Sequence, residues 1–107
     1  MLLMSCAVFG SSVVRTLDAP DTNISGLAWG DGKLWCLDSQ SSYCYGLDPV
    51  TGETDISFEF SGYSTYPAGG LTYNGTYLFG SFYNGSNYTY IYWYDTSGSY
   101  AGNDILC

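Results

Sequence analysis

The chain has 107 residues, of which 46% are apolar and 19% aromatic, and ten acidic side chains against two basic ones give a net charge of −8. Nucleic acids and anionic membrane surfaces are bound through clustered Lys and Arg, so this balance argues against both kinds of partner. The absence of histidine removes the commonest general base and zinc ligand. No apolar run approaches the roughly 18 residues of a membrane-spanning helix, so we expect no membrane span.

The first 20 residues predict the end of a β-sheet. The opening MLLMSCAVFG is apolar but short and has no basic residue ahead of it, which is atypical of a signal peptide. Together with the repeat described below, this favours two strands, at 3–9 and 12–18, over a targeting segment.

Residues 26–60 predict four strands joined by turns. The segment LDPVTGE has turn chemistry, because Asp48 can accept hydrogen bonds from amides ahead of it, Pro49 sets φ and Gly52 can take a positive φ. DISFEF alternates apolar and polar side chains, as a half-buried strand does. The predicted strands are 26–30, 33–38, 43–48 and 55–60.

The second half of the chain repeats the first. GLTYNGTYLF follows GLAWGDGKLW after 44 residues, and Gly10, Gly52 and Gly98 recur in similar surroundings. Asn74-Gly75 is a strong hairpin signal. The repeat predicts that the chain ends at the start of a fourth strand, near SYAGNDILC. The matching positions are Leu27 with Leu71, Trp29 with Tyr73, Leu34 with Leu78 and Asp48 with Asp95.

GLAWGDGKLWCLDSQSSYCYGLDPVTGETD resembles a blade repeat of the β-propellers of the NHL/YVTN type, strongly over 26–60 and more weakly over 70–98. The resemblance implies an all-β fold of tandem four-stranded antiparallel propeller-like blades, incomplete as a closed propeller, in a single domain. The implied parts are the end of one blade at 1–20, a complete blade at 21–62 and a second, partly complete blade at 63–107.

An incomplete propeller leaves its terminal sheets uncovered. Stacked repeats bury their apolar faces against neighbours and need polar caps at their ends. Here Leu2, Leu3 and Met4 lie at one end and Ile105 and Leu106 at the other, so these residues are candidate interface residues. We expect the chain to bind copies of itself head to tail, in a ring or a filament. The alternatives are a fragment of a larger propeller protein or enzyme, and a compact sandwich of the sheets.

Cys36 and Cys44 depart from the family, which usually has aliphatic residues at these positions. They lie on adjacent predicted strands. If Asp38 pairs with Ser42, the two sulfurs face each other and a disulfide is expected, whereas a shift of one residue prevents it. The alternative is a set of free buried thiols.

Cys6 and Cys107 lie at opposite ends of the chain, so a disulfide between them would close the chain on itself or link it to a neighbouring copy. No Cys-x-x-Cys pair and no EF-hand-type loop is present, so we expect neither a metal site nor a cofactor. Two carboxylate pairs lie beside turns, where such residues commonly cap backbone amides, so we expect no enzyme. These pairs are Asp18 with Asp21 and Glu53 with Asp55.

Four of the five asparagines begin an Asn-x-Ser/Thr sequon, at Asn23, Asn74, Asn84 and Asn87. Asn74 and Asn84 precede glycine and also suit hairpin turns, but turn chemistry does not require the following Thr or Ser. We therefore expect N-linked glycans on a secreted, extracellular protein. The resemblance implies that Asn23, Asn84 and Asn87 share the face on which propellers usually bind ligands, where glycans would shield it.

These patterns together favour a structural interaction protein, with covalent glycans and copies of itself as partners. The alternative from a different class is a carbohydrate-binding module. The segment YTYIYWYD at 88–95 alternates as a strand does, and an aromatic ring offers a sugar both an apolar face and a polar edge.

Overall fold

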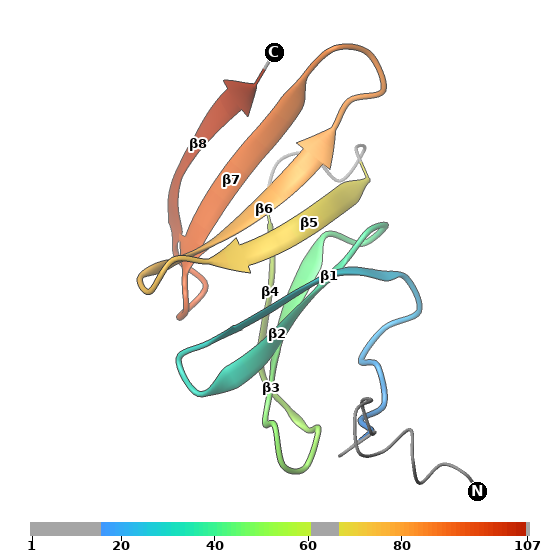
Figure 1. The fold of residues 1–107 in the computed structure, drawn as a ribbon, viewed down its shortest axis with the longest axis vertical. Coiled ribbons are helices and arrows are strands. Elements are labelled where there is room, and N and C mark those ends of the chain that lie inside the picture. Colours follow the sequence, from blue (N-terminus) through green and yellow to red (C-terminus); the bar gives the residue numbers. More distant parts are fainter. Residues whose placement is uncertain (1–15, 61–66, 107) are drawn as a thin grey trace, which may run out of the picture.

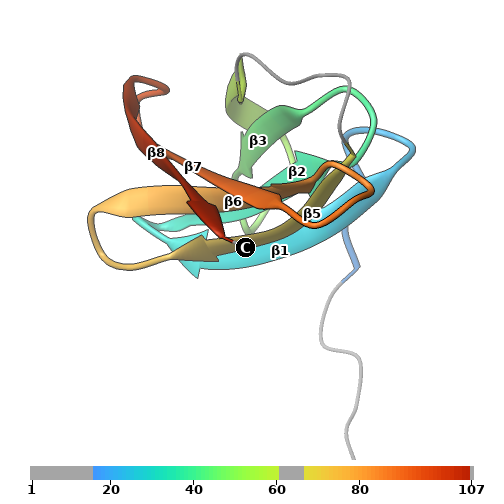
Figure 2. The same cartoon turned by 90° about the horizontal axis from the view of Figure 1, so that it is seen from above.

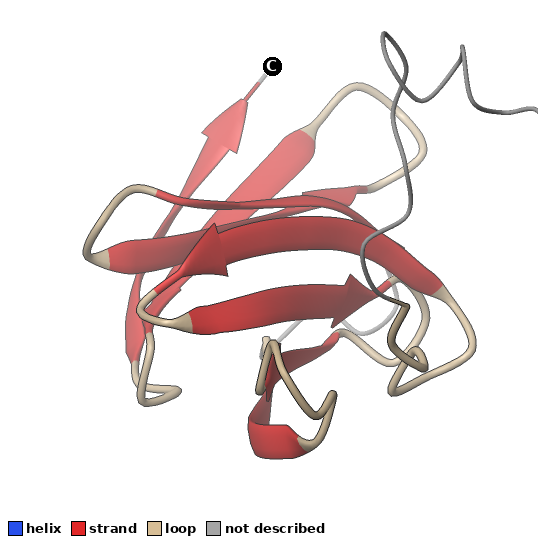
Figure 3. Ribbon diagram, turned by 60° about the horizontal axis from the view of Figure 1, so that its bottom comes forward, coloured by secondary structure: helices blue, strands red, loops and turns tan. Residues whose placement is uncertain are grey.

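The computed structural model describes residues 16–60 and 67–106. These residues form eight β-strands and no helix (Figures 1 and 3). Two four-stranded antiparallel sheets result, which we call sheet A, ordered β1-β2-β3-β4, and sheet B, ordered β5-β6-β7-β8. The all-β prediction is confirmed. The strands are β1 (Ile24–Gly30), β2 (Lys33–Asp38), β3 (Tyr43–Leu47), β4 (Thr54–Glu59), β5 (Ala68–Tyr73), β6 (Tyr77–Tyr83), β7 (Thr89–Asp95) and β8 (Tyr100–Leu106).

The four strands of sheet A begin and end within two residues of the predicted positions. Sheet B differs from its prediction at the C-terminal end, because Tyr100–Leu106 forms a complete fourth strand that pairs along β7. The strand predicted at 12–18 is not seen in its described part, since residues 16–18 lie outside any strand. The strand predicted at 3–9 lies outside the described residues.

Related turns, each with an Asp at its start and a positive-φ Gly near its end, join the third and fourth strands of both sheets, and the turn in sheet B is one residue shorter. The carboxylates of Asp48 and Asp95 each accept hydrogen bonds from backbone amides that follow them, and Gly52 and Gly98 take φ values of 79° and 92°. Hydrogen bonds to a charged carboxylate lower its pKa. The amides of Thr51 and Val50 lower the pKa of Asp48, and the Ser97 hydroxyl is the main group that lowers the pKa of Asp95. The turn predicted from LDPVTGE is confirmed, and a shorter turn with an Asp and a Gly in the same roles occurs in the second copy.

The two sheets pack face to face over an aromatic core. The ring of Phe60 lies 4.5 Å from that of Tyr94 and 6.0 Å from that of Phe82, measured between ring centroids. Such tilted pairs contribute about 0.5–1.5 kcal/mol each beyond the burial of their area. Sheet A adds Trp35 and Leu37 to this core, both fully buried.

The first strands of the two sheets, β1 and β5, lie side by side and run in the same direction (Figure 2). Near their starts, Ser25 Oγ donates a hydrogen bond to the carbonyl oxygen of Ala68, with 3.0 Å between the oxygens. At the other end, the ring of Tyr73 lies so close to Gly30 that an added Cβ would be 1.9 Å from it. A side chain at Gly30 would therefore prevent sheet B from packing this close to β1.

The disulfide predicted between Cys36 and Cys44 is not formed, and both thiols are free and buried. The register of β2 with β3 places Leu37, and not Cys36, opposite Cys44, so the two sulfurs leave opposite faces of sheet A. The turn between the strands explains this register. Ser42 takes a φ of 64° and lies outside the ladder, and its amide donates a hydrogen bond to the Asp38 carbonyl within the turn. Cys6 and Cys107 lie outside the described residues.

Candidate interaction site

The face of sheet A that points away from sheet B is apolar and only partly covered. Leu27 and Trp29 project from β1 on this face, and each is 61% exposed. The register places them opposite Cys36 and Leu34 of β2, and Leu47 of β3 continues the same row. We call Leu27 and Trp29 the β1 ridge.

The segment that precedes β1 covers part of this face. Leu17 and Pro20 line a cavity of about 360 Å³ together with Leu27, Cys36 and Leu47. Burial raises the pKa of the Cys36 thiol, so this thiol stays protonated at neutral pH and is a poor nucleophile. The cavity therefore supplies a mainly apolar surface, with Asp18 as the one acidic residue among those that line it.

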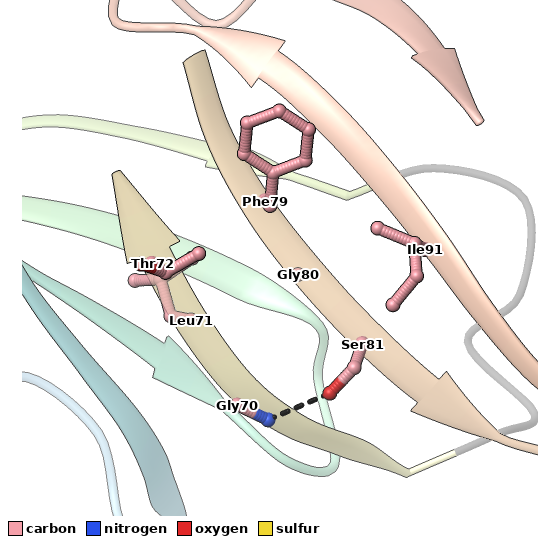
Figure 4. Close-up of a pocket in the computed structure, with 7 residues that line it drawn as sticks. All are labelled: Gly70, Leu71, Thr72, Phe79, Gly80, Ser81 and Ile91. Atoms are coloured by element: carbon pink, nitrogen blue, oxygen red, sulfur yellow. Dashed lines mark hydrogen bonds between the residues drawn. The ribbon is translucent and has the colours of Figure 1, made fainter. Parts of the chain in front are cut away.

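The opposite face of the molecule, on sheet B, carries a groove of about 420 Å³ (Figure 4). Its floor contains Gly70, whose amide donates to Ser81 Oγ at 2.8 Å. Phe79 and Ile91 form apolar walls, and Thr72 stands on the rim strand β5. We call this feature the sheet B groove. The ring of Trp93 extends its apolar border and lies 5.4 Å from that of Phe79.

A polar cluster ties the segment before β1 to the turn between β2 and β3. The Asp38 side chain, 1% exposed, accepts hydrogen bonds from the amides of Asn23, Gln40 and Ser41. Burial raises the pKa of Asp38, but these amides outweigh it and the net shift is downward. Its carboxylate is thus engaged as a backbone cap.

Tyr45 joins this cluster by donating its hydroxyl to Asp21 at 2.7 Å. Burial, followed by the hydrogen bond to Asp21, raises the pKa of Tyr45 to about 12, so the phenol stays protonated. In the other predicted carboxylate pair, Glu53 with Asp55, the Asp55 carboxylate forms an ion pair with Lys33, with 3.4 Å between Nζ and Oδ2. Within residues 16–60 and 67–106, no cluster of three metal-ligating side chains occurs.

The sequon asparagines lie at two edges of the structure. Asn23 precedes β1, while Asn84 and Asn87 lie between β6 and β7, and the contact between the starts of β1 and β5 places these turns at one edge. Asn74 lies between β5 and β6 at the opposite edge. Asn74 and Asn84 use the carbonyl oxygen Oδ1 to accept amide hydrogen bonds, which leaves the Nδ2 atom that a glycan would occupy outside those bonds.

Of the predicted interface residues, Ile105 and Leu106 lie on β8 and are 48% and 54% exposed. Leu2, Leu3 and Met4 lie outside the described residues. The β1 ridge and the sheet B groove were not among the predicted sites. The signal for the ridge was present, since Leu27 and Trp29 are the counterparts of Leu71 and Tyr73 in the repeat.

In the part of the chain that the structure describes, no helix has the length and apolarity needed to cross a membrane. Comparisons with protein-family models, with curated proteins and with solved structures found no match.

Proposed function

We propose that this chain is a structural, non-catalytic repeat unit with a propeller-like stacking of sheets, which associates head to tail with copies of itself. The observation that carries the proposal is that its two exposed faces are different, and each corresponds by the internal repeat to a face that is already paired inside the molecule. Such a contact is heterologous, and repeating it yields a ring or a filament.

The correspondence follows from the 44-residue repeat. Trp35 and Leu37, on the face of sheet A that packs on sheet B, occupy the positions of Phe79 and Ser81 in the second copy. In sheet B those positions lie on the outer face, at the groove. The surface that sheet A uses to bind sheet B thus has an uncovered counterpart on sheet B.

The reverse correspondence holds for the other surface. Leu78, fully buried against sheet A, occupies the position of Leu34, which lies on the outer face of sheet A beside the β1 ridge. Sheet B of one copy and sheet A of the next can therefore pack as sheets A and B do within the chain. An apolar face of this kind stabilises an assembly by burying area at about 25 cal/mol per Å².

We further propose that the protein is secreted and N-glycosylated. Asn23, Asn74 and Asn87 are exposed, and the turn bonds of Asn74 and Asn84 leave Nδ2 for attachment. Three of the sequons share one edge, so glycans there would flank the sheet faces and leave the faces themselves open.

The test is the particle mass of the full chain purified from a secretory host, measured by light scattering across a concentration series. The proposal predicts masses that exceed the glycosylated monomer and rise with concentration, and rings or fibres in negative-stain images. A single monomeric mass at every concentration would contradict it. Peptide mass spectrometry of the same material checks glycan attachment separately.

A further inference from the structure

We propose that the sheet B groove binds the β1 ridge of a second copy, with the Leu27 side chain seated over Gly70. This inference rests on the proposed self-association and specifies which residues meet.

A contact of this kind is already made inside the molecule, between β1 and β5. Strand β5 lies against Gly26 of β1, so closely that an added Cβ at Gly26 would be 2.8 Å from the Leu71 amide nitrogen and 3.0 Å from the Leu71 Cβ. The next glycine in β1, Gly30, is covered in the same way by the ring of Tyr73. The pair Leu71 and Tyr73 is thus seated on a glycine-lined surface of sheet A.

On the equivalent surface of sheet B, no residue within 16–60 and 67–106 packs in this way. Gly70 occupies the position of Gly26 in the repeat, yet a Cβ added at Gly70 would meet only Ser81 Oγ, at 3.8 Å. The same type of residue, at the same place in the repeat, is covered in sheet A and uncovered in sheet B. The sheet B groove lies at this uncovered place.

Two apolar side chains of β1 lack the partner surface that their counterparts in the repeat have. Leu27 and Trp29 are the repeat counterparts of Leu71 and Tyr73, but they are exposed, whereas Leu71 and Tyr73 pack against the core. Among the described residues, the ridge of sheet A therefore has no groove packed on it, and the groove of sheet B has no ridge packed in it. The established contact between β1 and β5 continues naturally as a contact between β5 and the β1 of a second copy.

The chemistry of the two surfaces agrees with this pairing. The groove walls, Phe79 and Ile91, are apolar, and its polar atom Ser81 Oγ already accepts the Gly70 amide. These walls therefore favour an apolar side chain, and Ser81 Oγ keeps the Gly70 amide as a hydrogen-bond partner when one enters. Leu27 meets this requirement.

The experiment uses the full glycosylated chain and two single variants. Gly70→Val fills the groove at a position with room for its Cβ, and Leu27→Asp makes the ridge polar. We expect each variant to fold, by far-UV circular dichroism, and to associate at least tenfold more weakly than the wild type in sedimentation velocity. Thr72→Arg, at an exposed rim position, blocks the groove by a second route if Gly70→Val fails to fold. Val50→Asp, at an exposed turn position that belongs to neither the ridge nor the groove lining, is the matched control and should associate like the wild type.

Mixing the two variants gives the decisive result. The Gly70→Val chain keeps its ridge and the Leu27→Asp chain keeps its groove, so an equimolar mixture should form a one-to-one complex although neither associates alone. If the wild type and both variants associate equally well, Leu27 does not pack over Gly70, and the proposed self-association still stands. A monomeric wild type would overturn both.

Discussion

Leu37 lies directly opposite Cys44 where β2 pairs with β3, so the thiols of Cys36 and Cys44 leave opposite faces of sheet A. Cys44 projects into the core between the sheets and is fully buried, whereas Cys36 lines the cavity under Leu17. Burial raises the pKa of both thiols. The two residues therefore have separate structural roles on opposite faces of sheet A.

The first prediction concerns these thiols. Cys44→Ser should destabilise the fold by about 1–3 kcal/mol, because it places a hydroxyl in an apolar core. Peptide mapping after alkylation in denaturant should show both Cys36 and Cys44 carrying the label, while the same two residues label slowly in the folded protein. A peptide in which Cys36 is joined to Cys44 would show that the register of β2 with β3 is wrong.

The second prediction contrasts two glycines at equivalent positions in the repeat. Gly26→Ala should destabilise the fold by about 1–3 kcal/mol, because its Cβ would overlap the β5 backbone. Gly70→Ala, whose Cβ meets only Ser81 Oγ at ordinary contact distance, should change the free energy of unfolding by less than about 0.5 kcal/mol. Urea unfolding of both variants checks this, and equal effects would contradict the close approach of β1 and β5.

The third prediction concerns acid stability. The pKa values of Asp48 and Asp95 are lowered in the folded state, so the stability they contribute is present above the unfolded-state pKa of about 3.9 and is lost as pH falls through the folded-state values. The melting temperature of the wild type should therefore decrease as the pH is lowered below about 4. The Asp48→Asn/Asp95→Asn variant keeps the Oδ1 acceptors but cannot titrate, so its melting temperature should fall less over the same range. An unchanged acid slope would exclude these turns as its source.

The fourth prediction separates a glycan from a turn. Thr76→Ala abolishes the sequon at Asn74 but keeps the backbone amide of residue 76, which donates to Asn74 Oδ1 at 2.9 Å. Asn74→Ala removes both features. Both variants should lose the mass of one glycan, and in unglycosylated material produced in bacteria only Asn74→Ala should have a lower melting temperature. Equal melting temperatures there would show that the Asn74 side chain does not support the turn.

The fifth prediction concerns Ser42, which is fully buried with φ at 64°. Its hydroxyl oxygen has no hydrogen-bond partner among the residues that the structure describes. Ser42→Gly removes both the unfavourable φ and the unsatisfied hydroxyl, and these gains outweigh the greater flexibility of glycine in the unfolded chain. We expect a stabilisation of about 1 kcal/mol, measured by urea unfolding. A destabilised variant would argue against the positive φ at this position.

The strands and turns were predictable from the sequence because their signals are local. Alternation in DISFEF and the Asp48 turn fix where β4 begins, and Asn74-Gly75 marks the hairpin between β5 and β6. The register of β2 with β3 was not predictable, because it depends on the backbone of the turn that ends at Ser42, and a shift of one residue exchanges the two faces.

The candidate site was only partly predictable. The repeat aligns Gly26 with Gly70 and Leu27 with Leu71, but the sequence does not say which member of each pair is covered. That distinction arises from the packing of sheet A on sheet B, which buries one face of each sheet and leaves the other open. The predicted interface at Ile105 and Leu106 was drawn from apolarity at the end of the chain alone.

The most direct test of self-association is hydroxyl-radical footprinting of the wild-type chain at rising concentration, followed residue by residue. We predict that oxidation of Trp29 on the ridge and of Phe79 in the groove falls in parallel as concentration rises, while oxidation of Val50 stays constant. Oxidation rates of Trp29 and Phe79 that are independent of concentration would contradict the account.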